Sequence, residues 1–368
     1  MTGAGTSPER RQAVRAAAQA LYTAQLTADP GAQAYLASRG IDAALACRLG
    51  LGAAGRSWTG AVDQLRHAGY TDSELVDAGV GFRSGKHAVV DVFRSRVLFP
   101  AHDRYGQLVG WAGRSTPTAP PQAPAWLNSA AGDYRKAELL HGLHEGRTRL
   151  AAGATPVLCE GVLDAHAVTL ATHHTCIGLA PGGTALTAQH VAALHQALPA
   201  ETDAPERGRS RPRVLVAFDA DDAGRHAAVA AWPMLHAAGL DTALVTLPTG
   251  TDPAEVPAQV LRHAIHTAQP LADLVIDHTL NAWPERRRWA EHTVAASRAA
   301  ARTIATLRPE QIGRQVTRVA TALHIPTEAV TTAVTDAATQ PSPPNGALAK
   351  DNDDWHQPPA TRHPGRAC

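Results

Sequence analysis

The chain has 368 residues, a formal net charge of +1, 44% hydrophobic residues and 18% charged residues. This apolar content supports a large packed core and excludes a chain that is disordered throughout, and no run approaches the roughly 18 apolar residues of a membrane span. The N-terminus lacks a secretory signal, and the four cysteines lie too far apart for a disulfide framework or a zinc site. We therefore expect a cytoplasmic protein of two or three compact units, with no membrane segment and no zinc in this chain.

The first half of the chain mixes helical and strand patterns. Residues 1–28 predict a basic, alanine-rich N-terminal helix that is broken at Asp29-Pro30-Gly31. Residues 29–150 predict a second unit, in which short helical stretches are followed by strands over 88–114. The polar stretch from Asp103 to Gly106 predicts a hairpin turn between two of these strands.

A different pattern begins after residue 150 and defines a predicted domain over 151–258. Four short apolar runs, each followed by a helical stretch, predict right-handed βαβ units and a parallel sheet: PVLCEG, TCIGLA, VLVAFD and TALVTLP. Residues 259–338 show helical periodicity only, and 339–368 are proline-rich and polar, which predicts a disordered tail. The expected fold class is α/β and α+β, with a mixed N-terminal subdomain, a parallel-sheet domain and a C-terminal helical segment.

Acidic residues follow the predicted parallel strands. Glu160 ends the first apolar run and Asp164 follows it, Asp219 and Asp221 follow the third, and Asp252 follows the fourth. Because the carboxyl ends of parallel strands line one crevice, we expect these side chains to converge. Carboxylates held together repel one another unless a hard cation neutralises them, and oxygen-only ligands favour Mg²⁺ or Mn²⁺. Helix N-capping is the better interpretation for any one of these Asp residues alone, and a metal site is the better one for the set.

The charges divide along the chain. Residues 81–149 hold 10 Lys or Arg against 5 Asp or Glu, whereas residues 155–256 hold 5 against 11. A basic segment beside an acidic metal crevice suits a polyanionic partner that is gripped and then brought to cations. Only 3 of the 34 basic residues are lysines, so a lysine carries more information here than an arginine.

Several segments resemble known protein families. Three resemble the signatures of the TOPRIM fold, which DnaG-type primases, type IA and II topoisomerases and some nucleases share: VLCEGVLDAHA, VLVAFDADDAGRHAA and LPTGTDPAEV. Three upstream segments resemble, in order, the N-terminal half of the catalytic core of bacterial DnaG-type primases: AYLASRGI, DVFRSRVLFPAHDRYGQLVGWAGR and AWLNSAAGDYRKAELLHGLHE. The resemblance covers about residues 30–260, and the helical stretch to about 336 is similar to the third part of that core.

This resemblance implies roles for individual residues. Glu160 corresponds to the family glutamate that acts on the proton of the attacking 3′-hydroxyl or holds a metal. Asp219 and Asp221 correspond to its metal-binding pair, with Asp164 and Asp252 in support. Five further residues match family positions that hold template or nucleotide phosphates, and we call them the basic ridge: Arg94, Arg96, Arg114, Asn128 and Lys136.

The resemblance implies synthesis of short RNA primers from NTPs on a single-stranded DNA template, with Mg²⁺ or Mn²⁺. Two departures bear on it: Ala125 stands where the family usually has a lysine, and no zinc-ribbon module is present. A replicative helicase or a separate zinc-module protein is therefore an expected partner. The alternatives are a TOPRIM-fold nuclease and a non-catalytic single-strand-binding replication accessory of a mobile element. A topoisomerase is disfavoured because none of the five tyrosines lies in a recognisable active-site setting.

Overall fold

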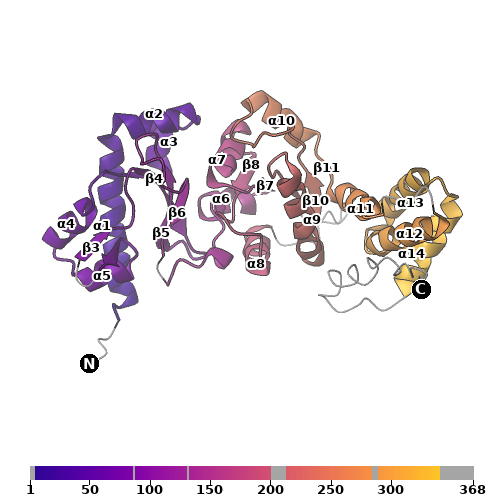
Figure 1. Cartoon of the computed structure of the whole chain (residues 1–368), viewed down its shortest axis with the longest axis horizontal. Helices are drawn as coiled ribbons and strands as arrows, with labels where there is room; N and C mark the ends of the chain where they lie inside the picture. Colours follow the sequence, from indigo (N-terminus) through magenta and orange to yellow (C-terminus); the bar gives the residue numbers. More distant parts are fainter. Residues whose placement is uncertain (1–4, 86–87, 131, 200–212, 284–288, 340–368) are drawn as a thin grey trace, which may run out of the picture. The chain divides into compact units, whose positions relative to one another are not determined.

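The computed structural model describes residues 5–85, 88–130, 132–199, 213–283 and 289–339 (Figure 1). The chain forms two compact units that divide between Val275 and Ile276. Within the described ranges, no helix is both long and apolar enough to cross a membrane. The predicted disordered tail lies outside the described residues from position 340 onward.

Helices open the first unit, and local capping sets their ends. The Ser7 side chain caps the first helix and accepts a hydrogen bond from the Arg10 backbone N–H. Asp29 caps the second helix, and Pro30 is the first residue of that helix. The Asp-Pro pair that breaks the first helix therefore also starts the second. The five helices of this part are α1 (Pro8–Thr27), α2 (Pro30–Ser38), α3 (Ala43–Arg48), α4 (Gly60–His67) and α5 (Asp72–Asp77).

A four-stranded antiparallel sheet follows, in the order β1-β4-β5-β6. Its strands are β1 (Gly52–Ala54), β4 (Arg96–His102), β5 (Leu108–Ser115) and β6 (Trp126–Asn128), and a separate pair joins β2 (Gly81–Ser84) to β3 (Ala88–Asp91). The predicted hairpin turn is confirmed, because the Asp103 carboxylate accepts hydrogen bonds from the backbone N–H groups of Tyr105 and Gln107. This hairpin connects β4 to β5.

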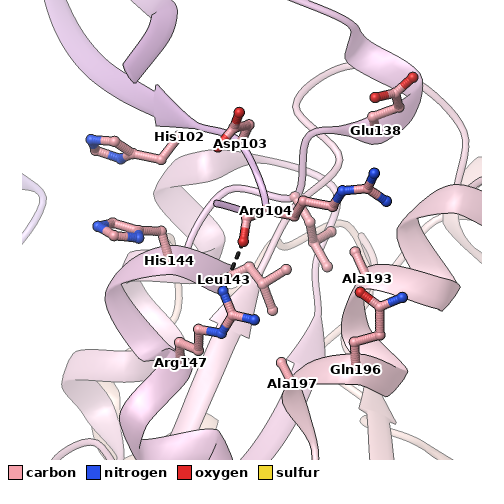
Figure 2. A pocket seen from close by; sticks show the side chains of 11 residues that line it. His102, Asp103, Arg104, Glu138, Leu143, His144, Arg147, Ala193, Gln196 and Ala197 are labelled. Atoms are coloured by element: carbon pink, nitrogen blue, oxygen red, sulfur yellow. Dashed lines mark hydrogen bonds between the residues drawn. The ribbon is translucent and has the colours of Figure 1, made fainter. Parts of the chain in front are cut away.

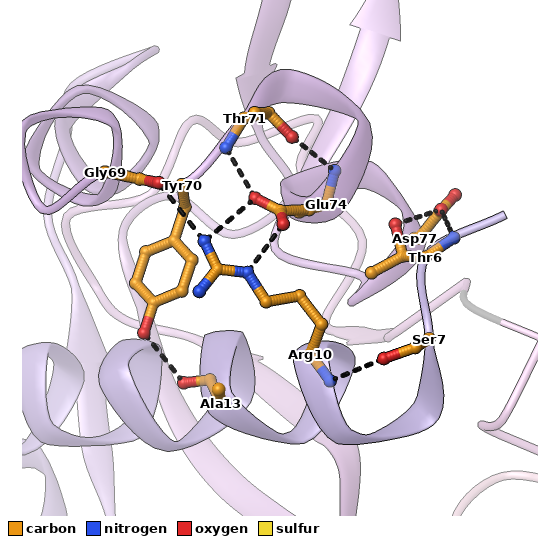
Figure 3. Close-up of polar contacts among 9 residues, drawn as sticks. All are labelled: Thr6, Ser7, Arg10, Ala13, Gly69, Tyr70, Thr71, Glu74 and Asp77. Carbon is orange, nitrogen blue, oxygen red and sulfur yellow. Dashed lines mark hydrogen bonds and ion pairs between the residues drawn. The ribbon is translucent and has the colours of Figure 1, made fainter. Parts of the chain in front are cut away.

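Helix α1, expected as a segment of its own, packs into the core of this sheet. Tyr22 and Trp111 are fully buried and meet edge to face, with ring centroids 5.4 Å apart. The Trp111 indole N–H donates to the Gln19 side chain over 2.7 Å. At its N-terminal end, the Arg10 guanidinium donates to the Glu74 carboxylate of α5 and lowers the pKa of Glu74 to about 2 (Figure 3).

The second sheet has the order β11-β10-β9-β7-β8. Strands β7 (Thr155–Leu158), β8 (Cys176–Leu179), β9 (Arg213–Val216) and β10 (Asp241–Leu244) are parallel, which confirms the predicted parallel sheet. A short strand that the sequence did not indicate, β11 (Gln269–Pro270), pairs antiparallel with β10. Because β7 has β8 on one side and β9 on the other, the strand order reverses at β7, where open α/β sheets bind ligands.

Helices connect these strands as predicted. They are α7 (Val162–Ala171), α8 (Ala188–Ala197), α9 (Asp222–Ala237) and α10 (Ala258–His266). The 3₁₀ helix η1 (Lys136–Glu138) and helix α6 (Leu143–Ala151), which the sequence analysis did not predict, precede β7. One helix begins later than expected: residues 252–257 form a turn before α10. Pro257 would lie in the interior of the expected helix, where its ring and its missing N–H are not tolerated, which explains the later start.

Apart from the two residues of β11, the elements found in the described part of the predicted helical region are helices. Helix α11 (Leu271–Asn281) crosses the division between the units, and α12 (Ala290–Ile304), α13 (Pro309–Leu323) and α14 (Thr327–Thr339) follow. Small and β-branched side chains line the core of the last three helices, including Ala300, Ile304, Val319 and Val330, each fully buried.

Candidate active site

Glu160 and Asp219 meet at the point where the sheet order reverses. The ladder between β7 and β9 continues past the strands, because the Ala217 N–H donates to the Leu158 carbonyl over 2.8 Å. Just beyond it, the Asp219 backbone N–H donates to a carboxylate oxygen of Glu160 over 3.2 Å. The structure thus brings together the two acidic residues that the sequence placed after separate strands.

Asp221 and Asp252 lie on two loops that are joined through their backbones. The Ala220 N–H donates to the Thr251 carbonyl and the Gly250 N–H donates to the Ala220 carbonyl, both over 2.9 Å. Asp221 caps α9 through the Gly224 N–H at 2.7 Å, and Asp252 accepts from the Glu255 N–H at 2.8 Å. Capping therefore describes part of what Asp221 does, whereas Asp252 closes a turn, and each contact uses only one of the two oxygens of its carboxylate.

Asp164 differs from the metal ligand that we expected. Its side chain is only 7% exposed, and both of its oxygens accept backbone N–H groups, from Gly161 at 3.1 Å and from Ala254 at 3.3 Å. Burial, with the charges of Asp252 and Asp219, raises the pKa of Asp164 to about 7. These contacts make Asp164 a bridge between the loop after Glu160 and the loop that carries Asp252.

The donor chemistry of this acidic crevice (Glu160, Asp164, Asp219, Asp221 and Asp252) fits a hard cation. One carboxylate oxygen of Asp219, Oδ1, is buried and has no hydrogen-bond partner among the described residues. Burial, followed by the charges of Glu160, Asp252 and Asp221, raises the pKa of Asp219 to about 6. No three acidic, His or Cys side chains of the described part are already gathered to hold a metal. An unpartnered buried oxygen among like charges is nevertheless the environment that a divalent cation relieves.

A glycine allows α9 to begin directly against the crevice. A Cβ atom built on Gly224 would overlap the backbone carbonyl oxygen of Asp219. Only a residue without a side chain permits this approach between the helix and the loop. Gly224 therefore belongs to the site although it carries no functional group, and it was not among the predicted site residues.

Arg94, between β3 and β4, and Arg114, on β5, lie half-buried beside aromatic rings. The Arg94 guanidinium lies over the Trp58 ring, 3.8 Å from its centroid, and Trp58 is 61% exposed. Arg114 lies 5.5 Å from the centroid of the Trp126 ring and donates to the Tyr35 hydroxyl. Trp58 was not among the predicted site residues, although an aromatic residue within the polar stretch Arg-Ser-Trp-Thr-Gly was a usable signal.

Arg96 has a different environment from the one expected of a phosphate-binding residue. It is 4% exposed, and its guanidinium donates to the backbone carbonyls of Gly113, Pro124 and Ala125. Burial, with the neighbouring charges of Arg94 and Arg114, lowers the pKa of Arg96. These contacts tie β4 to β5 and to the segment before β6, which indicates a structural role for Arg96.

Asn128 and Lys136 lie where the two sheets of the first unit are connected. The Asn128 side-chain amide donates to the Gly182 carbonyl, in the loop after β8, over 3.1 Å. Lys136 is exposed, and its backbone carbonyl is hydrogen-bonded to the His190 ring at 2.8 Å. Nearby, Asp133 forms ion pairs with Arg11 and with the buried Arg15 of α1.

The β4–β5 hairpin is also tied to α6. The side chains of His102 and Glu145 are 3.0 Å apart. The Arg147 guanidinium donates to the Arg104 carbonyl over 2.7 Å (Figure 2). The pocket that His102, Arg104 and Arg147 help to line has a volume of only about 10 Å³. That space admits about one water molecule, so the pocket is not a second nucleotide site.

This chain has a parallel sheet with acidic residues after β7, β9 and β10, and a mixed domain with basic residues precedes that sheet in the sequence. This arrangement defines the TOPRIM class of nucleic-acid enzymes. Known proteins agree with this assignment. Residues 21–147 match the family described as DNA primase catalytic core, N-terminal domain, and residues 157–256 match the family described as Toprim-like.

Individual relatives give the same result. The chain is 30% identical over 257 residues to a DNA primase of Clostridium acetobutylicum, an alignment that covers 70% of this chain and 40% of the relative. The chain therefore spans less than half the length of this curated relative. The crystal structure of the RNA polymerase domain of Mycobacterium tuberculosis primase DnaG superimposes with a TM-score of 0.69 at 26% identity, covering 86% of this chain and 99% of that one. A second structure of that domain, with a double-stranded DNA oligomer that has a 6-nucleotide overhang, gives 0.69 at 27% identity, covering 87% and 98%.

The chain carries a DnaG-type primase catalytic core with its Toprim domain.

Proposed function

We propose that this chain synthesises short RNA primers on a single-stranded DNA template. The observation that carries the proposal is the contact between Glu160 and the Asp219 backbone at the point where the strand order reverses, beside the buried, unpartnered Asp219 oxygen. The match to the primase catalytic core and the similarity of the chain to the RNA polymerase domain of a primase support the reaction class. By analogy with its relatives, we propose that the chain acts in the cytoplasm, with a replicative helicase or a separate zinc-module protein as a partner.

The acidic crevice would hold the reacting groups. Asp219 and Asp221, with Asp252, are the residues proposed to hold Mg²⁺ or Mn²⁺, and Asp164 keeps their loops in register through its two backbone contacts. When bound, divalent cations align a 3′-hydroxyl with the α-phosphate of an NTP and stabilise the leaving pyrophosphate. Glu160, half-buried next to Asp219, is the residue proposed to accept the proton of that hydroxyl.

The basic ridge is the proposed binding surface for the template and the nucleotide. Arg94 over the exposed Trp58 offers a charge for a phosphate next to a ring on which a base can stack. Lys136 offers a compact ammonium, which suits a triphosphate. The related Mycobacterium tuberculosis domain has been crystallised with DNA, which supports a DNA partner for this chain.

A priming assay tests the proposal directly. Labelled NTPs are supplied with single-stranded DNA, with and without Mg²⁺ or Mn²⁺, and the products are resolved by length. We expect short ribonucleotide chains that require the template and the cation. Cation-dependent cutting of the DNA without ribonucleotide incorporation would identify a nuclease instead. Binding of the DNA with neither reaction would identify a non-catalytic accessory.

Arg94 and Arg96 are predicted to have separable roles. Arg94→Ala is expected to make the plot of log affinity for single-stranded DNA against log salt concentration less steep by about 0.7, because one phosphate contact is lost. Arg96→Ala is expected to lower the free energy of unfolding by about 2 kcal/mol or more, because buried carbonyls lose their donor. Fluorescence anisotropy over a salt series measures the first effect and urea unfolding the second. An unchanged salt slope for Arg94→Ala would place the DNA elsewhere on the surface.

Ala125 provides a prediction of gained function. It is exposed and stands where the family usually has a lysine, beside Trp126. Ala125→Lys is expected to lower the NTP concentration needed for the first dinucleotide by about tenfold, the value of one charge-assisted phosphate contact. Elongation of a preformed primer should change little. If the variant has no effect, Arg135→Ala shows whether that nearby guanidinium already fills the position, and inertness of both variants would exclude this segment from nucleotide binding.

A further inference from the structure

The backbone that carries Lys136 is fixed by the N-terminal turn of α8. The Lys136 carbonyl is hydrogen-bonded to His190 Nε2 at 2.8 Å, and the Ala137 carbonyl accepts from the Thr187 hydroxyl at 2.6 Å. His190 is 0% exposed. Consecutive carbonyls at the start of η1 are therefore held by a single helix end of the TOPRIM domain.

Thr187 and His190 form the capping box of α8, and a histidine at the third helical position is unusual in such a box. The His190 N–H donates to the Thr187 hydroxyl oxygen, and the Thr187 N–H donates to His190 Nδ1, both at 3.2 Å. Capping boxes ordinarily use Glu or Gln at this position. A glutamate would accept the same N–H group, but it has no proton to donate to the Lys136 carbonyl.

The hydrogen bonds determine the state of the His190 ring. A backbone N–H is always a donor, so Nδ1 must be the unprotonated nitrogen, and Nε2 then carries the hydrogen that the Lys136 carbonyl accepts. Burial, which outweighs the hydrogen bond to Lys136, lowers the pKa of His190 and keeps the ring neutral. Both nitrogens are thus used, one within α8 and one across to η1.

We infer that His190 is a positioning residue for the nucleotide: through the Lys136 carbonyl it fixes the origin of the side chain whose ammonium binds the triphosphate. The inference rests on the proposed role of Lys136 in nucleotide binding. The inference gives the N-terminus of α8 a role in positioning Lys136, which could not be predicted from the place of this helix between β8 and β9 in the sequence. It also explains why a fully buried histidine lies at a helix N-terminus, where capping alone requires only Thr187.

The test combines kinetics with a chemical readout that needs no catalysis. The sequence contains only three lysines, so acylation of Lys136 by an amine-reactive ester can be followed peptide by peptide with mass spectrometry. ATP with Mg²⁺ is the probe, and we expect it to protect Lys136 in the unaltered chain. His190→Ala should weaken that protection and raise the KM for NTP in primer extension about tenfold or more, with little change in kcat.

Matched variants separate positioning from general structure. His190→Gln keeps an acceptor for the Thr187 N–H and a donor for the Lys136 carbonyl, so it should restore most of the affinity. His195→Ala, an exposed position of the same helix, should behave as the unaltered chain. In a Lys136→Ala background, His190→Ala should raise KM no further, because its effect passes through that side chain. If His190→Ala does not fold, His190→Glu takes its place in the cycle, because a glutamate keeps the acceptor for the Thr187 N–H but has no proton to donate to the Lys136 carbonyl.

The outcomes are distinct. Equal KM effects of His190→Ala with and without Lys136, or unchanged ATP protection in His190→Ala, would overturn the inference. Absence of ATP protection in the unaltered chain would also overturn it, whether or not primers are made. Protection of Lys136 that depends on His190, in a chain that makes no primers, would sustain the inference while the proposed reaction fails.

Discussion

Asp219→Asn is expected to abolish primer synthesis, by about a thousandfold or more, while leaving the fold intact. The substitution removes a charge that would hold a catalytic cation at the switch point of the sheet, next to Glu160. The folded state is not expected to suffer, because burial and the neighbouring carboxylates raise the pKa of Asp219 to about 6, so its charged form is unfavourable there without a cation. Without divalent cations, the unfolding temperature of Asp219→Asn should equal or exceed that of the unaltered chain.

A thermal shift measured with Mg²⁺ makes this prediction independent of catalysis. Because a ligand that binds only the folded state stabilises it, Mg²⁺ should raise the unfolding temperature of the unaltered chain more than that of Asp219→Asn. Asp222→Asn is the matched control, since its side chain is 87% exposed and pairs with Arg225 on the surface of α9. Priming by Asp219→Asn at the unaltered rate would remove Asp219 from the metal site.

The elements of the fold could be predicted from the sequence, whereas the arrangement of the second sheet could not. Alternating apolar runs and helices indicated β7 to β10 and their parallel direction. Nothing in those runs indicated that β7 lies between β8 and β9, because strand order is decided by packing between segments distant in the chain. The two-residue strand β11 is too short to produce a pattern.

In the candidate site, too, the residue types could be predicted from the sequence, whereas their environments could not. The spacing of Glu160 and Asp219 after two strands was sufficient to predict their contact, because the ends of parallel strands share one edge. The sequence could not separate Arg94 from Arg96, which lie two positions apart in one motif. One lies half-buried over an aromatic ring and the other is buried among carbonyls. The exposure of a side chain depends on the tertiary structure. A resemblance in sequence identifies matching residues but does not show how exposed they are.

The role of Asp164 required coordinates for a related reason. A carboxylate four residues after Glu160 is equally compatible with metal binding and with helix capping. Only the Ala254 N–H, which reaches it from 90 positions further along the chain, shows that Asp164 joins two loops of the crevice. The acidic crevice therefore contains residues proposed to contact the cations and one that holds their loops in place.

Gly224→Ala is expected to reduce activity by about a hundredfold and to destabilise the fold, although it changes no functional group. The added Cβ would overlap the Asp219 carbonyl oxygen, so either α9 or the Asp219 loop must move. Such overpacking costs about 1–3 kcal/mol, and a displacement of about 1 Å at reacting groups lowers rates by about two orders of magnitude. Gly313→Ala is the control, because Gly313 lies in α13 with open space around its Cβ position, where alanine should stabilise the helix by about 0.5–1 kcal/mol. Urea unfolding and primer extension measure both effects, and full activity of Gly224→Ala would show that the Asp219 loop does not need this close approach.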